Sequence, residues 1–265
     1  MERNFLLTIE YDGTGFFGWQ RQPGVPTIQG TLEDALSAVL GKKIQVNGTS
    51  RTDAGVHAYG QRASFSGEFG IPTDKLALAV NNRIAGAMKG KMATGPIRIK
   101  EVREMPADFH ARFNAKGKTY LYKIHNSKEP DLFLRNYCYA IREPLDEEAM
   151  RLAASRIEGT HDFQCFQASG GTERETTVRT IYKTDVLRRG EDISIRVTGD
   201  GFLYNMVRII AGTLVETGLG KRTPMSMDSV IRGRDRQNAG HTAPPQGLYL
   251  MEVYYELQEV PGYDG

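Results

Sequence analysis

Two hydrophobic periods divide the first hundred residues into strands and helices. Residues 5–11 alternate between apolar and polar positions, as in a strand, whereas the apolar positions within 28–40 recur at helical spacing. Thr27 stands at a favourable N-cap position and Gly41 follows the last turn, so this spacing predicts a helix. Strands over 44–49, 61–65 and 97–103 and a helix from Thr73 towards Arg83 complete the order β-α-β-β-α-β.

A similar succession starts again after Pro106. It consists of predicted strands over 119–125, 177–187, 193–198 and 248–255 and predicted helices over 146–157, 203–216 and 227–232. We therefore predict an α+β protein with two ferredoxin-like halves, residues 1–106 and 107–265, joined into one mixed, mainly antiparallel sheet with helices on one face. A central cleft between the halves is the natural place for a site.

Composition describes an ordinary folded protein of 265 residues, with 25% charged and 40% hydrophobic residues. The longest apolar stretch, 201–215, is interrupted by Arg208, and the chain enters a strand pattern directly after Met1, so we expect neither a membrane span nor a signal peptide and place the protein in the cytoplasm. Cys138 and Cys165 lack metal-cage spacing and are predicted to be reduced core thiols.

The formal net charge of +2 hides an uneven distribution. Residues 83–128 carry eleven Lys or Arg against three Asp or Glu, and aromatic residues alternate with the cations over 108–122. Cations bind phosphates and flat rings stack on unpaired bases, so this segment favours a nucleic-acid partner. Tyr120 and Tyr122 face the same side of one strand, either as a stacking surface or as a pair of core tyrosines.

Three residues stand out by their surroundings. Asp53 lies in a loop of small residues, 50–58, as a catalyst or as a turn-forming carboxylate, with Arg51 two positions before it. Arg208 lies in an apolar helix, where it needs a carboxylate or phosphate partner unless its head reaches solvent. Leu248 enters the last strand and fits a core position.

The glycines of 13–18 match the dinucleotide-binding fingerprint Gly-x-Gly-x-x-Gly. That fingerprint requires a helix to open at once, so that its amino end faces the pyrophosphate, whereas no helical period begins before Ile28. A nicotinamide enzyme is therefore disfavoured, and a loop with tight turns and an exposed aromatic residue is preferred.

Several motifs together resemble the tRNA pseudouridine synthase A family, in the family's order and over nearly the whole chain. They are Glu10-Tyr11-Asp12-Gly13, Gly18-Trp19-Gln20-Arg21-Gln22, Arg51-Thr52-Asp53-Ala54-Gly55-Val56-His57, Tyr120-Leu121-Tyr122, Met206-Val207-Arg208, and the segment from Ala243-Pro244 to Leu250. The resemblance implies a homodimer with a positively charged cleft that isomerises uridine to pseudouridine at positions 38, 39 and 40 in the anticodon stem-loop of tRNA. This isomerisation involves no redox change, so neither a metal nor a nucleotide cofactor is expected.

The resemblance also implies roles for five residues. Asp53 corresponds to the catalytic aspartate, Arg208 to the basic residue that pairs with it, and Tyr120 to the tyrosine that stacks on the target uracil. Arg51 corresponds to the arginine that fills the space of the flipped-out base, and Leu248 to the apolar residue beneath that base.

One segment departs from the family pattern, because residues 86–96 look longer than their counterpart. The competing hypothesis is a tandem RNA-binding protein without catalysis, in which Asp53 would be freely replaceable. A carboxylate in a small-residue loop and a lone helical arginine favour the enzyme.

Overall fold

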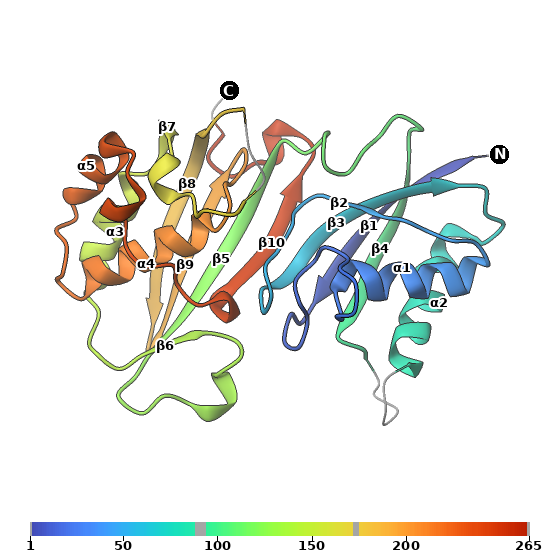
Figure 1. Cartoon of the computed structure of the whole chain (residues 1–265), viewed down its shortest axis with the longest axis horizontal. Helices are drawn as coiled ribbons and strands as arrows, with labels where there is room; N and C mark the ends of the chain where they lie inside the picture. Colours follow the sequence, from blue (N-terminus) through green and yellow to red (C-terminus); the bar gives the residue numbers. More distant parts are fainter. Residues whose placement is uncertain (1, 88–93, 172–174, 264–265) are drawn as a thin grey trace. The chain divides into compact units, whose positions relative to one another are not determined.

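The computed structural model describes residues 2–87, 94–171 and 175–263, and the chain folds as two compact units (Figure 1). Unit 1 comprises Met1–Ala115 with Leu250–Val253, and unit 2 comprises Lys116–Tyr249 with Tyr254–Gly265. Both contain helices and mainly antiparallel strands, which confirms the predicted α+β class. The segment 86–96, which the sequence marked as long, lies largely outside the described residues.

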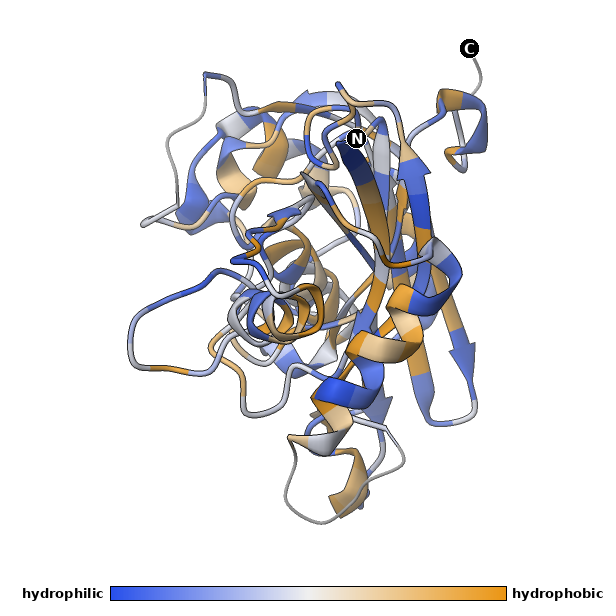
Figure 2. Cartoon of the chain, turned by 90° about the vertical axis from the view of Figure 1, so that its right-hand side faces the viewer, coloured by the Kyte–Doolittle hydropathy of each residue, from blue (hydrophilic) through white to orange (hydrophobic). Residues whose placement is uncertain are grey.

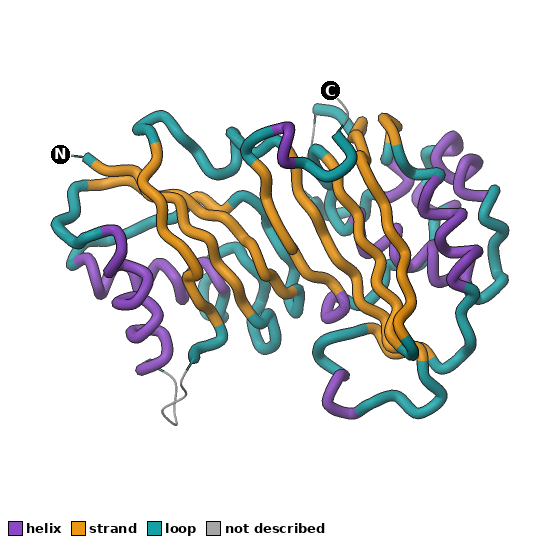
Figure 3. The backbone as a smooth tube through the Cα atoms, turned by 180° about the vertical axis from the view of Figure 1, so that it is seen from behind, coloured by secondary structure: helices purple, strands orange, loops and turns teal. Residues whose placement is uncertain are grey.

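Unit 1 has the predicted succession of elements. These are β1 (Arg3–Tyr11), α1 (Ile28–Leu40), β2 (Asn47–Gly48), β3 (His57–Gly67), α2 (Thr73–Gly86) and β4 (Ile97–Met105). The strands pair in the order β4-β1-β3-β2, and every pair is antiparallel. Figure 3 shows these strands side by side, so that β1 and β3 form the centre of the unit.

The two helices of unit 1 form because their ends and faces suit the positions they occupy. The Thr27 side chain accepts a hydrogen bond from the Gly30 amide, and Gly41 ends α1 at φ 66°, a conformation that favours glycine. In α2, Leu76, Val80 and Ile84 recur every fourth residue and are buried, while the other positions, polar residues and Leu78 among them, are exposed or half-buried (Figure 2).

In unit 2, mainly antiparallel strands again form the centre. The elements of this unit are β5 (Gly117–Asn126), β6 (Tyr139–Ile141), α3 (Glu147–Ser155), β7 (Gly159–Asp162), β8 (Val178–Arg189), β9 (Asp192–Gly199), α4 (Met206–Gly218), α5 (Ser226–Gly233) and β10 (Leu248–Tyr254), whose residues are divided between the units. The order is β5-β9-β8-β7, and β6 adds to β5 in parallel. The short strands β6 and β7 were not predicted.

Two predicted elements are shorter than expected. The strand over 44–49 is reduced to β2, because the Ile44 and Val46 amides bond to the Ser37 hydroxyl and the Glu33 carboxylate of α1 instead of a neighbouring strand. The helix expected from residue 203 begins at Met206, because Asn205 has a left-handed backbone at φ 60°.

Within the described residues, no helix combines the length and the apolar character that crossing a membrane requires.

Candidate active site

Asp53 lies in unit 1, in the loop that leads from β2 to β3. Its backbone carbonyl accepts a hydrogen bond from the Val56 amide at 3.1 Å, and Gly55 has φ 78°, so residues 53–56 form a tight turn. The Asp53 side chain is half-buried, whereas Arg51 is exposed. The turn is closed by the backbone, which leaves the carboxylate group outside the turn's own hydrogen bond.

The buried amide of Gln61 on β3 holds the start of this loop. Its Nε2 donates to the Ser50 carbonyl at 2.7 Å, and its Oε1 accepts from the Ser50 amide at 3.3 Å. One residue earlier, the Thr49 amide still bonds to the Arg62 carbonyl in strand fashion. The loop backbone turns away from β3 at Ser50. The Gln61 side chain, which is 0% exposed, therefore supplies the hydrogen bonds to Ser50 that a neighbouring strand would otherwise supply.

Thr52 is fixed from two other elements. Its hydroxyl lies 2.7 Å from the Tyr11 hydroxyl at the end of β1, and its carbonyl accepts from the Trp19 amide at 2.9 Å. Both Tyr11 and Trp19 are buried. The residue immediately before Asp53 is thus anchored through its side chain and its backbone, which limits the positions open to the carboxylate.

The glycine loop 13–18 packs directly against the Asp53 loop. A Cβ at Gly18 would lie 2.6 Å from the Thr52 carbonyl oxygen, and a Cβ at Gly13 would lie 2.1 Å from that of Val56. Only glycine permits this approach of two backbones. Over residues 2–27, all of which the structure describes, no helix begins, so the loop does not have the geometry of a dinucleotide-binding turn, and its glycines serve the Asp53 loop instead.

A second loop of unit 1 brings a cation and an aromatic ring next to this region. The Ala111 carbonyl accepts from the Thr49 hydroxyl at 2.9 Å, and the Ala111 amide donates to the Ser64 hydroxyl at 3.0 Å. The two following residues are exposed, Phe113 by 74%, with the Arg112 guanidinium 5.7 Å from the Phe113 ring centre. An exposed ring beside a guanidinium suits stacking on an unpaired base.

Tyr120 and Tyr122 lie on β5 in unit 2, and both are buried. The Tyr120 ring packs edge-on against Phe202 at a centroid distance of 5.1 Å. Tyr122 donates its hydroxyl hydrogen to the Pro244 carbonyl at 2.7 Å, and burial raises the pKa of this phenol far above its usual range. Tyr122 is therefore a neutral core residue that holds the segment around Pro244.

Arg208 stands in the first turn of α4 and holds the same segment. Its Nε donates to the Ala243 carbonyl at 2.8 Å, and its Nη1 donates to the Asn205 side-chain oxygen at 2.7 Å. The Ala243 amide in turn donates to the Arg208 carbonyl at 3.1 Å. These bonds fix the plane of the guanidinium, and planarity is what allows an arginine to bind a carboxylate or phosphate through two parallel bonds.

Leu248 begins β10 and is 7% exposed. The residue before it, Gly247, lies so close to the Tyr122 ring that a Cβ there would be 2.6 Å from the ring's Cζ atom. The loop 243–247 is therefore pressed against β5 between Arg208 and Leu248.

The five predicted site residues fall into two groups. Asp53 and Arg51 belong to unit 1, whereas Tyr120, Arg208 and Leu248 belong to unit 2, where one loop connects the surroundings of Arg208 and Leu248. Gln61 and the role of Tyr11 were not predicted from the sequence. The only sequence signal for Gln61 is that a polar side chain stands within a strand pattern.

Within the described ranges, no three His, Cys, Asp or Glu side chains gather closely enough to hold a metal ion. Both cysteines are buried and unbridged, as predicted, and burial raises the pKa of Cys165 to about 12.

Comparison with known proteins gives consistent matches. Residues 7–114 and 153–256 match a family described as tRNA pseudouridine synthase. The chain is 47% identical to tRNA pseudouridine synthase A of Caldicellulosiruptor bescii over 96% of this chain and 100% of the relative. It is 48% identical to tRNA pseudouridine synthase A of Geobacillus sp., over 97% of this chain and 100% of the relative.

A solved structure titled "Crystal Structure of a Cbf5-Nop10-Gar1 Complex" aligns with 77% of this chain at 14% identity and a TM-score of 0.37. The aligned region covers 46% of that chain.

Proposed function

Because the chain belongs to the tRNA pseudouridine synthase A family, and is thus an isomerase that converts uridine in tRNA to pseudouridine, we propose that it acts on positions 38, 39 and 40 of the anticodon stem-loop. The observation that carries this proposal is the construction of the Asp53 loop. Thr49 and Ser50 are hydrogen-bonded to β3, and Thr52 is hydrogen-bonded to Tyr11 at the end of β1. A non-catalytic RNA-binding protein has no need to position a single carboxylate so closely.

Asp53 is the catalytic residue in this proposal. Pseudouridine formation breaks the bond between ribose and N1 of uracil, turns the base, and joins C5 to ribose, with the C5 proton lost at the end. A carboxylate serves either by attacking as a nucleophile or by removing a sugar proton to give a glycal. Both routes require an ionised Asp53, and we assign to Arg208 the pairing with it that keeps it ionised.

The substrate base has to leave the helical stack before it can react, at a cost of a few kcal/mol. In this proposal Tyr120 stacks on the extruded uracil, and Leu248 makes the apolar contact beneath that base. Arg51 fills the space that the base vacates in the RNA helix. The exposure of Arg51 and the burial of Leu248 support these assignments. Arg112 and Phe113 add an exposed cation and ring for the RNA.

The larger organisation follows the same proposal. The order β4-β1-β3-β2 in unit 1 and the recurrence of β5, α3, β8, β9 and α4 in unit 2 support two ferredoxin-like halves, residues 1–106 and 107–265. We propose that the enzyme acts as a homodimer in the cytoplasm, where its tRNA substrate is found, and that it uses no metal or nucleotide cofactor.

The test is release of tritium from tRNA labelled at uracil C5, under single-turnover conditions. Asp53→Asn is expected to abolish release while retaining affinity for tRNA, and Asp34→Asn, which changes an exposed carboxylate on α1, serves as the matched control. If Asp53→Asn keeps the wild-type rate, the catalytic assignment is wrong. If the wild-type protein binds tRNA without releasing tritium, the non-catalytic alternative is correct.

A further inference from the structure

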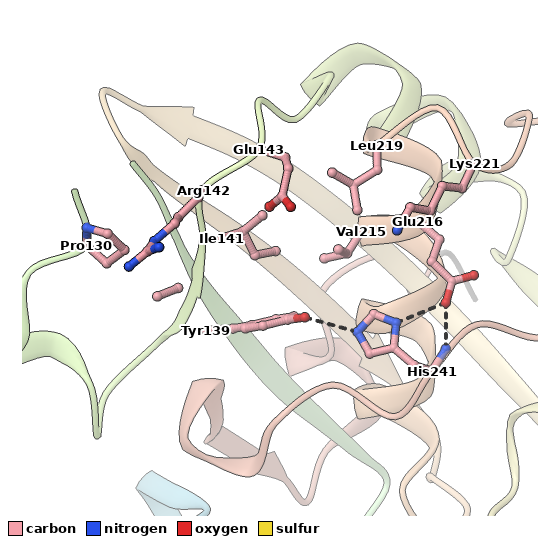
Figure 4. A pocket seen from close by; sticks show the side chains of 11 residues that line it. Pro130, Tyr139, Ile141, Arg142, Glu143, Val215, Glu216, Leu219, Lys221 and His241 are labelled. Carbon is pink, nitrogen blue, oxygen red and sulfur yellow. Dashed lines mark hydrogen bonds and ion pairs between the residues drawn. The ribbon is translucent and has the colours of Figure 1, made fainter. Parts of the chain in front are cut away.

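Unit 2 contains a pocket of about 640 Å³ that involves none of the residues assigned above (Figure 4). It lies between β6 with the residues that follow it and the carboxyl-terminal part of α4, and His241 closes one side. Its volume falls within the range of about 300–1,000 Å³ that is usual for small-molecule sites.

One acid that lines this pocket, Glu216, has partners on both carboxylate oxygens. Glu216 Oε1 accepts from the His241 backbone amide at 2.9 Å and lies 3.0 Å from the His241 Nδ1, while Oε2 accepts from the Arg222 Nε at 2.6 Å. On its other edge, the His241 Nε2 lies 3.3 Å from the Tyr139 hydroxyl. Figure 4 shows the contacts that run from Tyr139 through His241 to Glu216 along one side of the pocket. The Glu216 carboxylate is thus fully hydrogen-bonded, and the His241 ring and the Tyr139 hydroxyl are held in place beside the cavity.

The cations of the pocket are not committed in this way. Among the residues that the structure describes, neither the Arg142 guanidinium nor the Lys221 ammonium forms a side-chain hydrogen bond or ion pair, although both residues line the cavity. Figure 4 shows them on opposite sides of it, with Glu143 as the one further carboxylate. Arg142, Lys221 and Glu143 together give the pocket a net charge of +1. The Tyr139 hydroxyl and the His241 ring lie nearby.

We propose that this pocket binds a phosphate ester. The Arg142 guanidinium and the Lys221 ammonium supply charged donors to phosphate oxygens from different sides. The remaining lining includes Ile141, Val215 and Leu219, which offers an apolar surface for the attached ribose or base. The phosphate has two possible sources, the backbone of the tRNA or a free mononucleotide, and the tRNA source rests on the function proposed above.

The local readout is the proton NMR signal of His241, which is one of five histidines and is identified by its loss in His241→Gln. Titration of the full chain with inorganic phosphate and with adenosine 5′-monophosphate is expected to shift this signal. The double variant Arg142→Gln/Lys221→Gln is expected to weaken that binding by about tenfold. Lys128→Gln/Arg189→Gln, which removes the same charge outside the pocket, is expected to leave it unchanged, and thermal unfolding verifies that both variants fold.

Binding of tRNA at several salt concentrations separates the two sources. If the pocket holds backbone phosphate, the salt slope of the binding constant falls by about two in the pocket variant and not in the control. If only the mononucleotide response is lost, the source is a free nucleotide. The proposal is overturned if neither phosphate, the mononucleotide nor tRNA distinguishes the pocket variant from its control. Failure of the wild type to bind tRNA would count against the proposed function, and the mononucleotide titration would still decide the pocket.

Discussion

The hydrogen bonds of the Gln61 side-chain amide predict how much stability and rate are lost when Gln61 no longer holds the Asp53 loop. Gln61→Leu replaces this amide by an apolar group of similar size, so the core keeps its volume and loses only hydrogen bonds. The lost bonds are those to the Ser50 carbonyl at 2.7 Å and the Tyr11 hydroxyl at 3.5 Å, and those from the Ser50 amide at 3.3 Å and the Arg62 amide at 3.1 Å. Ser50 is itself buried, so water does not readily replace the missing partner.

The expected loss of stability follows from these bonds. A buried backbone group that loses its partner costs about 1–3 kcal/mol. Because the three bonds above 3 Å are weaker than the bond to the Ser50 carbonyl, we expect the free energy of unfolding to fall by about 2–4 kcal/mol in total. The loop also gains freedom next to Asp53, and a displacement of about 1 Å at a reacting group costs roughly 100-fold in rate. We therefore expect the single-turnover rate to fall by at least about tenfold, with tRNA affinity nearly unchanged.

Asn81→Leu is the matched control. The Asn81 amide on α2 makes the same kind of paired contact, donating to the Ile99 carbonyl at 2.9 Å and accepting from the Ile99 amide at 2.8 Å, but on β4 and not at the Asp53 loop. Urea unfolding measures stability for both variants, and tritium release at saturating enzyme measures the rate, at a temperature where both are folded. Both variants should lose stability, and only Gln61→Leu should lose rate. If Gln61→Leu is destabilised and still releases tritium within twofold of Asn81→Leu, Gln61 does not position Asp53.

Two further predictions concern stability. Burial raises the pKa of Glu216, but the hydrogen bonds from Arg222 and His241 outweigh it and lower the pKa to about 2. This carboxylate therefore contributes stability above its unfolded pKa of about 4.3 and loses that contribution as the pH falls towards 2. Because this carboxylate is partly exposed and its ion pairs are screened by solvent, Glu216→Gln should cost on the order of 1 kcal/mol at pH 7. In urea unfolding, the difference in the free energy of unfolding between wild type and variant should narrow below about pH 5; a difference independent of pH contradicts the prediction. Gly18→Ala should lower the melting temperature more than Gly15→Ala. Both glycines have positive φ, 84° and 79°, but only a Cβ at Gly18 would meet a backbone oxygen, at 2.6 Å. Equal losses in thermal unfolding would show that the glycine loop moves away from the Asp53 loop without cost.

Local signals made part of the fold predictable. The bounds of α1 were correct because Thr27 and Gly41 act within one turn of the helix. The strand over 44–49 was too long because its amides bond to Ser37 and Glu33, which are close in space but belong to a different element. The alternation of apolar residues does not show when a backbone amide bonds to a helix side chain instead of a neighbouring strand.

The candidate site was predictable to the same extent. Asp53 and Arg208 stand out in the sequence because each is a charge among small or apolar residues. Gln61 and Tyr11 do not, because their importance comes from partners 11 and 41 residues away. Pairings at that distance depend on the register of β1, β2 and β3, which a single sequence does not specify.

The glycine loop offers a place for a reporter of the Asp53 loop. Its inner side, at Gly13 and Gly18, touches the backbone of 52–56, while Thr14 is exposed and Gly15 faces open space. The native thiols Cys138 and Cys165 are buried, and burial raises the pKa of each. A maleimide dye would therefore attach selectively to a Thr14→Cys variant, and its emission would follow the loop in real time as tRNA arrives.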